Sequence, residues 1–369
     1  MSRTATPDSF IQRIWYEGSA AYWILLPLSW LFAGLGFLQR IWYGDSAAYW
    51  ILLPLSWLYA GLGAVRRKLY ERDILRSKAV KVPVIVVGNI TVGGTGKTPV
   101  TIWLAHHLKD RGMRPGIVSR GYGGSVGRKP LRVTRDSDPD AVGDEALLMA
   151  RRSACPVVVH PNRVRAADEI SGMGVDVIIS DDGLQHYRLA RDYEVAVVDG
   201  ARGFGNRKLL PAGPLREPVL RLISVDRVLV NRSVMRSERV MGALPEGLVV
   251  TDFYLKGNAA RSLDNRDSVL LSSFAGKAVH AVAAIGNPGR FFMFLESYGM
   301  QVIEHALGDH AKLTEKDLRY DDGLDVLMTE KDAVKCGDVN IERCWYVPVE
   351  VNIDRPQEWL DELQSAVSQ

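Results

Sequence analysis

The sequence predicts an α/β protein with two domains, the larger built on a mostly parallel sheet, preceded by a hydrophobic helical anchor. The 369 residues are enough for two ordinary domains and an extension. Apolar residues make up 47% and charged residues 24%, which favours a packed core. Apolar runs alternate with helical stretches in two successive parts of the chain. We therefore expect an anchor over 1–70, a larger domain over 71–244, a two-stranded linker over 245–274 and a smaller α/β domain over 275–369.

Charge and cysteine content exclude several classes of protein. The net charge is only +3, which argues against a general nucleic-acid binder. Cys155, Cys336 and Cys344 lie far apart and form no CxxC pair, so we expect no disulfide framework and a reducing compartment. Positive charge is concentrated in one cluster over 66–81.

The N-terminal region contains a tandem duplication. Residues 13–39 and 40–66 align without gaps, with 21 of 27 positions identical. Each copy carries 19 uncharged residues, 20–38 and 47–65, and a membrane span needs ~20. We expect one or two spans, with the following basic cluster on the cytoplasmic side. A buried pair of soluble helices and a signal peptide are the alternatives.

A glycine-rich loop predicts a P-loop NTPase-like domain. The β-branched run Val82–Asn89 predicts a buried strand, and a helical stretch follows the loop. In such a loop the backbone N–H groups surround phosphates, Lys97 reaches the β/γ oxygens and Thr98 holds Mg²⁺. An ordinary tight turn is the alternative. The expected ATP-binding residues are Thr91, Val92, Gly93, Gly94, Thr95, Gly96, Lys97 and Thr98.

A second buried run, Val175–His186, contains Asp181 and Asp182, an arrangement that predicts a Mg²⁺ ligand at the end of a strand. Gln185 nearby joins the expected metal set, and which aspartate contacts the metal stays open. The alternative is a helix N-cap. Arg120, Tyr122 and Arg163 follow other predicted strands and are candidates for binding phosphate or substrate.

Further segments complete the expected sheets. The runs 193–200 and 226–232 predict further strands of the larger sheet. Segments 247–257 and 267–274 alternate like a hairpin that bridges two domains. A last helix is expected from about Pro356. His310 lies in a predicted loop, where a lone histidine is usually just solvated.

Several motifs together resemble the tetraacyldisaccharide 4′-kinase family. They are VVGNITVGGTGKTP, SRGYGG, VGDE, SDDGLQH, LLPAGPLREP, AIGNPGRF, GDH and TEKDAVK, spread from about Lys68 to the C-terminus. The resemblance implies an ATP- and Mg²⁺-dependent lipid kinase of lipid A biosynthesis, with two α/β domains. Its acceptor would be the 4′-hydroxyl of an acylated glucosamine disaccharide 1-phosphate. It also implies a place at the inner membrane, with the catalytic domains on the cytoplasmic face.

The resemblance also implies roles for individual residues. Asp144 matches the family's catalytic carboxylate, and His310 matches its partner across an interdomain cleft. Glu145 joins Thr98 and the Asp181/Asp182 pair around Mg²⁺. We expect a monomer. The second hydrophobic copy departs from the family pattern, as do Ala311 and Lys312 after the histidine.

Two other classes of protein are alternatives to a kinase. A P-loop GTPase or ATPase that serves as a switch or metallochaperone would need a guanine-reading Asn-Lys-x-Asp motif after a strand. The segments DRVLVNRS and TEKD both lack it. A membrane scaffold with a vestigial nucleotide fold would not be expected to keep Lys97, Thr98 and Asp181.

Overall fold

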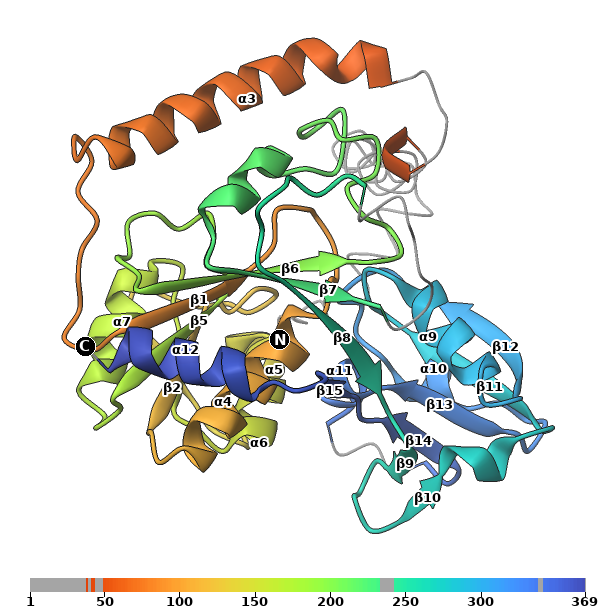
Figure 1. The fold of residues 1–369 in the computed structure, drawn as a ribbon. Helices are drawn as coiled ribbons and strands as arrows, with labels where there is room; N and C mark the ends of the chain where they lie inside the picture. The colour runs from red at the N-terminus through yellow and green to blue at the C-terminus, as the bar shows by residue number, and fades with distance from the viewer. Residues whose placement is uncertain (1–37, 39–40, 44–48, 233–241, 338–340, 369) are drawn as a thin grey trace, which may run out of the picture.

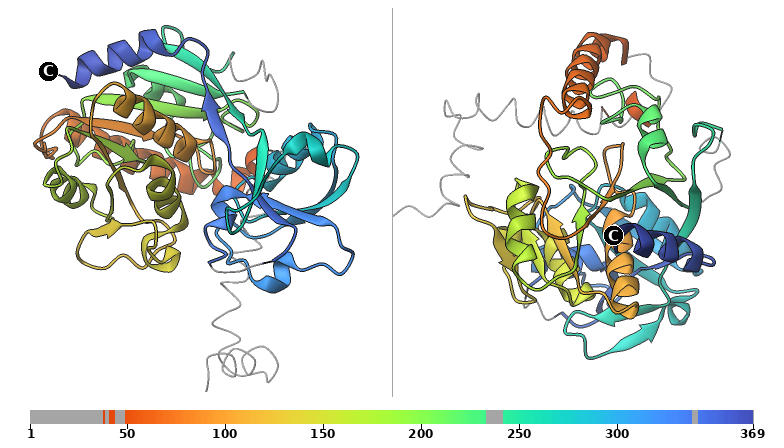
Figure 2. Two further views of the ribbon diagram at one scale, coloured as in Figure 1. Left: turned by 90° about the horizontal axis from the view of Figure 1, so that it is seen from below. Right: turned by 60° about the vertical axis from the view of Figure 1, so that its left-hand side comes forward.

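A computed structural model describes residues 38, 41–43, 49–232, 242–337 and 341–368. These form two sheets with helices packed against them, and a long helix, α3, runs along one side of the larger part (Figure 1). Figure 2 shows the same two bodies from below and from the side.

The larger sheet is parallel except at its edges. Within the described residues it has nine strands in the order β15-β8-β7-β6-β1-β5-β2-β4-β3. Pairs from β8 to β4 are parallel, whereas β15 and β3 are antiparallel to their neighbours. The strands are β1 Val84–Gly88, β2 Pro115–Ser119, β3 Leu131–Val133, β4 Val157–Val159, β5 Val177–Asp181, β6 Tyr193–Asp199, β7 Arg227–Asn231, β8 Val250–Lys256 and β15 Glu350–Asn352.

Both faces of this sheet are covered, which explains its continuous apolar strands. Alternate residues of β1 enter different cores: Ile85 and Val87 face α4, α6 and α12, whereas Val84 and Val86 face α7 and the loop that carries η1. The short helix α5 precedes α6. The helices are α4 Lys97–Asp110, α5 Pro139–Val142, α6 Asp144–Ser153, α7 Arg163–Ser171, η1 Val219–Ser224 and α12 Gln357–Val367.

The second sheet has six strands among the described residues, in the order β10-β9-β14-β13-β11-β12. The last four are parallel, and β9 is antiparallel to both its neighbours. The strands are β9 Ala259–Ser262, β10 Ser268–Leu270, β11 Ala278–Ala283, β12 Gln301–Ala306, β13 Asp325–Thr329 and β14 Cys344–Val347. One face packs against η2 and α9, and the other against α10 and the segment of α11. These helices are η2 Leu271–Phe274, α9 Pro288–Glu296, α10 Glu315–Leu318 and α11 Glu330–Ala333.

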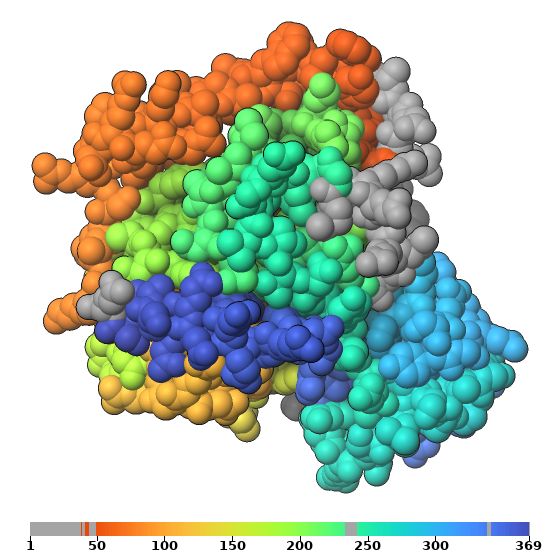
Figure 3. Space-filling model, in the orientation of Figure 1, coloured from red at the N-terminus to blue at the C-terminus, as the bar shows by residue number. Residues whose placement is uncertain are grey.

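The chain passes between the two sheets twice, from β8 to β9 and back from β14 to β15. The expected hairpin of 247–257 with 267–274 is wrong, because β8 pairs with β7 and β15, and β10 pairs with β9. Phe253 explains the difference, since it is fully buried in the core of the larger sheet. The helix expected from about Pro356 is confirmed as α12, and it lies across the larger part of the molecule (Figure 3).

The N-terminal segment is described only in part. The first copy of the duplication lies almost wholly outside the described residues, and the second contributes α3 Tyr49–Glu71. Leu53 and Ser56 of α3 are buried, and the Ser56 hydroxyl donates to Leu209 O at 2.8 Å. In the part of the chain that the structure describes, no helix is long and apolar enough to cross a membrane. The expected helix is therefore confirmed from Tyr49 onward, but the expected span is not.

Trp359 of α12 offers a test of whether the C-terminal helix completes the larger core. Its ring is buried and stacks on Trp103 of α4, with centroids 5.3 Å apart. Trp359→Ala should lower the free energy of unfolding by about 3–5 kcal/mol, because a large ring is lost from a packed core. Chemical denaturation measures this, with the exposed neighbour Glu358→Ala as a control that should change little. Equal stability of both variants would contradict the packing of α12.

Candidate active site

The loop between β1 and α4 has the backbone shape of a phosphate-binding loop. Gly93 and Gly96 have φ values of 104° and 102°, which residues with a side chain rarely adopt. A Cβ added to Gly94 would meet no atom within 4 Å, so the loop is open to a ligand there. The loop, Lys97 and Thr98 line a cavity of about 1190 Å³ that is also lined by residues of the second sheet. Backbone N–H groups at a helix N-terminus of this kind bind anions.

Two of the expected ATP-binding residues, Thr91 and Val92, hold this loop in place through backbone contacts. Thr91 is buried and forms an isolated bridge with Leu215, and Val92 donates its N–H to Pro214 O at 2.8 Å. The structure brings Val92 to the cavity wall but not Thr91. The strand β7 also holds the loop, because the side-chain amide of Asn231 on this strand donates to Thr95 O at 3.2 Å.

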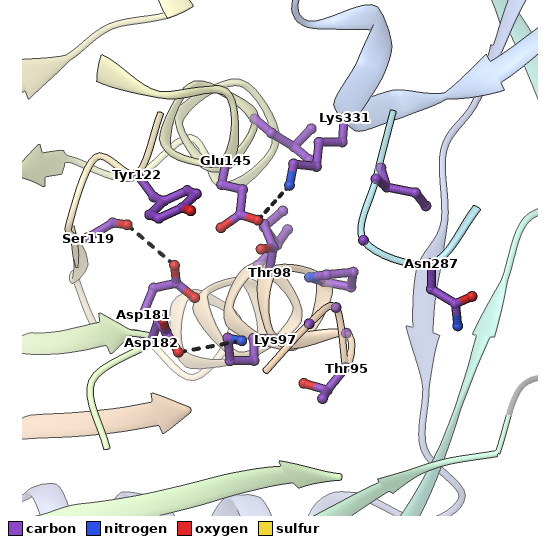
Figure 4. A pocket seen from close by; sticks show the side chains of 18 of the residues that line it. Thr95, Lys97, Thr98, Ser119, Tyr122, Glu145, Asp181, Asp182, Asn287 and Lys331 are labelled. Carbon is purple, nitrogen blue, oxygen red and sulfur yellow. Dashed lines mark hydrogen bonds and ion pairs between the residues drawn. The ribbon is translucent and has the colours of Figure 1, made fainter. Parts of the chain in front are cut away.

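Lys97 and Arg216 both contact Asp182. Lys97 Nζ lies 3.4 Å from Asp182 Oδ1 (Figure 4), and Arg216 Nη1 lies 3.0 Å from the same oxygen. Burial by itself would raise the pKa of Asp182, but these two cations outweigh it and hold the pKa well below its usual range. Asp182 is therefore a permanent anion that orients Lys97 beside the loop.

Asp181 has the opposite environment. Its carboxylate is 1% exposed and accepts only long hydrogen bonds, from Ser119 Oγ at 3.3 Å and Thr101 Oγ1 at 3.4 Å. Burial, together with the charges of Glu145 and Asp182, raises the pKa of Asp181 to about 7 despite the opposing charges of Lys97 and Arg163. Because the charged form of this buried carboxyl group is unfavourable by itself, a bound cation would stabilise it.

These residues fit a Mg²⁺ ion held mainly by Asp181. The site's ion pairs go to Asp182, which leaves the Asp181 oxygens for a metal. Among the described residues, no three His, Cys, Asp or Glu side chains gather closely enough to hold a metal ion by themselves. Mg²⁺ in phosphoryl-transfer sites is usually bound by one or two carboxylates, and nucleotide phosphates and water supply the other oxygens.

The side chains of the remaining predicted residues differ in their exposure to the cavity. The Gln185 amide donates to Asn89 O at 3.0 Å and to Glu217 Oε2 at 2.8 Å, so it braces the base of the loop. Arg163 is buried and donates to the Asp181 backbone O at 3.0 Å. Arg120 and Tyr122 are exposed on the cavity wall, where a substrate can reach them.

Asp144 and His310, predicted as partners, are in contact. Asp144 is the first residue of α6 on the larger sheet's side, and His310 lies in the loop after β12 of the second sheet. His310 Nδ1 lies 2.9 Å from Asp144 Oδ2 and 3.1 Å from Oδ1. Gly143 lets the start of α6 pack directly against the backbone of Tyr122, because a Cβ there would lie 2.4 Å from the Tyr122 carbonyl oxygen. The imidazole faces the cavity and the carboxylate lies behind it.

The charge state of Asp144 is fixed by its neighbours. Burial acts to raise its pKa, but the hydrogen bond from His310 and the charges of Lys331 and Lys335 lower it below the ordinary value. Gly143 is the N-cap residue of α6, and the backbone N–H that the Asp144 carboxylate accepts is that of the next residue, Glu145. A charged, buried carboxylate is thus held against an imidazole.

Two lysines of the second domain lie close to this pair, and the sequence alone predicts no role for them. Lys331 Nζ lies 2.8 Å from Glu145 Oε1 (Figure 4), and Lys335 Nζ lies 3.9 Å from Asp144 Oδ2. Both belong to TEKDAVK, a motif noticed only as part of the family resemblance. The available signal was two cations spaced i, i+4 after a predicted strand, which places them on one face of a turn.

A second set of contacts joins the two sheets on the other side of the phosphate loop. Arg290 of α9 forms an ion pair with Asp199 at the end of β6. Arg202 donates to Gly286 O at 3.2 Å, and its guanidinium lies 3.3 Å from a Cβ placed on Gly93. Contacts between the two domains therefore lie on both sides of the phosphate loop.

A phosphate loop at the end of a parallel strand, a buried carboxylate on the neighbouring strand and a carboxylate–imidazole pair facing them define a P-loop phosphotransferase. The sequence model of the family "Tetraacyldisaccharide-1-P 4'-kinase" matches residues 48–368. The chain belongs to this family, and its enzyme class is that of a lipid kinase of lipid A biosynthesis.

Individual relatives agree with the family match. The tetraacyldisaccharide 4′-kinase of Hahella chejuensis is 44% identical over 97% of this chain and 98% of its own length. That of Halorhodospira halophila is 49% identical over 77% of this chain and 83% of its own. A crystal structure of LpxK from Aquifex aeolicus, described as an "apo" form in complex with ATP, is 26% identical, with a TM-score of 0.71 over 87% of this chain and 99% of that chain. These matches favour the kinase over a GTPase switch or a scaffold.

The opposite environments of Asp181 and Asp182 predict opposite effects on stability. A carboxyl whose pKa is raised on folding stabilises the protein at low pH, and this stabilisation is lost as pH rises from about 4 to about 7. In metal-free buffer, Asp181→Asn should therefore raise Tm at pH 8, by about 2 °C or more, and have a smaller effect at pH 4.5. Scanning calorimetry at both pH values measures this.

Asp182→Asn is the matched control, because the pKa of Asp182 is lowered. Its stabilisation is present above the unfolded pKa, so this variant should lower Tm at pH 8. A fall in Tm for Asp181→Asn at pH 8 would show instead that its bonds to Ser119 and Thr101 outweigh the cost of its buried charge.

Proposed function

We propose that the chain transfers the γ-phosphoryl group of ATP to the 4′-hydroxyl of a tetraacylated glucosamine disaccharide 1-phosphate, and that Asp144 and His310 activate this hydroxyl. The observation that carries the proposal is their contact on the wall of the cavity that also contains the phosphate loop. Nucleotide and acceptor machinery thus share one space.

The phosphate loop and Lys97 bind and orient the nucleotide. The loop's backbone N–H groups face the phosphates, and Lys97 contributes a positive charge that Asp182 holds in place. Mg²⁺, held by Asp181 with Thr98 and Glu145 nearby, would neutralise charge that develops on the β- and γ-phosphate oxygens. Positioning and charge neutralisation supply most of the catalysis in phosphoryl transfer.

The acceptor hydroxyl is a weak nucleophile and needs a base. His310 Nδ1–H donates to Asp144, which leaves Nε2 without a proton on the side that faces the cavity. Lys331 Nζ, 3.4 Å from Nε2, agrees with this tautomer because a lysine can only donate. The hydroxyl proton passes to Nε2 as the oxygen attacks, and Asp144 stabilises the imidazolium. A base held in this way typically contributes 10²–10⁴-fold.

The cavity also reaches α3, which suits a lipid acceptor. Tyr59 and Arg66 of α3 line the same cavity as the phosphate loop. The outer surface of α3 carries exposed apolar side chains and is followed by the basic cluster 66–81. The exposed side chains include Trp50, Ile51, Leu55, Trp57, Leu58, Leu62 and Val65. A bilayer against this surface, at the cytoplasmic face of the inner membrane, would let the acyl chains stay in lipid while the sugar enters the cavity.

The helix η1 extends this apolar surface. Leu220 and Ile223 are 69% and 58% exposed, while Leu222 between them is buried. The segment that precedes η1 contacts α3, since the Tyr59 hydroxyl donates to Arg216 O at 3.1 Å. These two exposed aliphatic side chains lie close to the apolar helix α3, which indicates that η1 and α3 share one membrane-facing surface.

The pair of Asp144 and His310 is tested by kinetics on the lipid acceptor. Asp144→Asn should lower kcat by 10²–10⁴-fold with ATP binding nearly unchanged, because an amide can neither hold the imidazolium nor accept a proton. His310→Ala should have a similar effect, and the double variant should be little worse than the worse single one. Tm serves as the control, since Asn has nearly the same size and shape as Asp and an unchanged Tm excludes unfolding. Activity of Asp144→Asn within a few-fold of wild type would refute the assignment.

The membrane surface is tested by a change that leaves the cavity untouched. In the full chain, Leu220→Ser with Ile223→Ser should raise KM for acceptor presented in anionic vesicles by about 5-fold, with kcat unchanged, because less apolar area enters the bilayer. The matched control is Leu270→Ser with Met293→Ser, two exposed apolar residues on the second domain. Equal KM values for both double variants would place η1 away from the membrane.

A further inference from the structure

Lys331 lies on the cavity wall that the second domain contributes. It belongs to α11, which directly follows β13, and its amino group reaches across to α6. Its Nζ lies 2.8 Å from Glu145 Oε1, 3.4 Å from His310 Nε2, and 4.0 Å from both Asp144 Oδ2 and Asp309 Oδ1. One cation from the second domain therefore contacts both halves of the hydroxyl-activating pair.

This lysine is charged whenever the site is assembled. Its side chain is 18% exposed, and burial acts to lower its pKa, but the charges of Glu145, Asp144 and Asp309 outweigh burial and raise the pKa above the usual range. The amino group is therefore a fixed positive charge at the edge of the cavity.

The neighbouring cations are held differently. Lys335 donates to Ala284 O and Ala311 O and lies 2.7 Å from Asp332, so it is tied within its own domain. Arg152 also forms an ion pair between the domains, with Glu330 at 2.7 Å, but the Glu330 side chain is only 14% exposed. Lys331 is held instead by Glu145, a residue of the opposite domain whose side chain is 30% exposed. A flexible lysine held by a half-exposed carboxylate can change partners when a stronger anion enters the cavity.

Figure 4 shows where such an anion would lie. Glu145 lies next to Thr98, the second residue of α4, and Lys331 points at Glu145 from the opposite wall. Phosphates bind at this end of α4, since its N-terminus carries the glycine loop. Lys97 approaches the loop from the side of Asp182, so the side of His310 has its own cation in Lys331.

We propose that Lys331 binds the γ-phosphate of the bound nucleotide from the second domain and stabilises the transferring group, and that Glu145 holds this lysine when no nucleotide is present. The proposal rests on the proposed phosphoryl transfer and names a further catalytic residue for it. Negative charge spreads over the equatorial oxygens of the transferring group, and a preorganised cation there lowers the barrier. Since Lys331 also contacts His310, it couples the donor group to the activated acceptor.

Nucleotide affinity tests the γ-phosphate contact without any lipid. Wild type should bind a non-hydrolysable ATP analogue more tightly than ADP. Lys331→Met should reduce this preference about 10-fold and leave the ADP affinity within 2-fold, whereas Lys331→Arg keeps the charge and most of the preference. Isothermal titration calorimetry in the presence of Mg²⁺ gives all six constants. An unchanged preference in Lys331→Met, or an equal loss of affinity for both nucleotides, would overturn the proposal.

Lys312→Met is the matched control for a purely structural role. Lys312 also forms an ion pair between the domains, with Asp140, but both side chains are exposed and lie outside the cavity wall. It should behave as wild type. If Lys312→Met loses the preference as Lys331→Met does, interdomain ion pairs in general are responsible and the proposal fails. Equal Tm values of the variants exclude unfolding, and Lys331→Gln replaces the Met variant if its Tm falls.

Turnover on the acylated disaccharide phosphate separates this proposal from the proposed function. Lys331→Met should lower kcat by 10²-fold or more, with KM for the lipid little changed, because the contact forms on the transferring group. If wild type itself does not phosphorylate this lipid, the proposed function fails, while the nucleotide titrations still decide whether Lys331 contacts the γ-phosphate. Wild-type-like kcat in Lys331→Met would overturn its catalytic role.

Discussion

The contact between Asp144 and His310 is the constraint on which the rest of the structure depends, because its two residues belong to different sheets. A pair separated in this way is useful only if the sheets are held in register to within a fraction of an ångström. The fold meets this requirement with two crossings of the chain and with contacts on both sides of the phosphate loop. On one side Lys331 joins α11 to α6, and on the other Arg290 joins α9 to the end of β6.

The distribution of charge in the site follows from the same arrangement. Adjacent aspartates at the end of β5 have opposite roles: Asp182 is neutralised by Lys97 and Arg216, whereas Asp181 is left as a buried carboxylate with a raised pKa. The larger domain therefore contains a buried carboxyl group whose charged form is unfavourable beside the phosphate loop, and the second domain brings positive charge toward it. This is an unstable arrangement for the protein alone and a favourable one with a metal ion and a nucleotide.

The sequence predicts the parts of this site that are local in the chain. A strand, a glycine loop and a helix identify the phosphate site, and an apolar run that ends in two aspartates identifies the metal site, because both signals lie within a few residues. The Asp144–His310 pair came from motif resemblance alone. The position of Lys331 depends on how the two domains face each other, and the pairing of β8 depends on contacts with β7 and β15, which are distant in the chain. No periodicity contains that information. The contacts of Gln185 could not be predicted from the sequence for a similar reason, since its amide donates to Asn89 and Glu217, and Glu217 is 32 residues away.

The path of the last residues has a consequence for how the protein is made. The strand β15 and the helix α12 belong to the larger domain, although they are synthesised after the whole second domain. On the ribosome, the second sheet is therefore complete while the first still lacks an edge strand and the helix that covers Trp103. The domain that begins first is finished last, and a chain that terminates early presents an exposed apolar face on its nucleotide-binding half. Quality control by proteases is expected to recognise such chains before they acquire a working phosphate site.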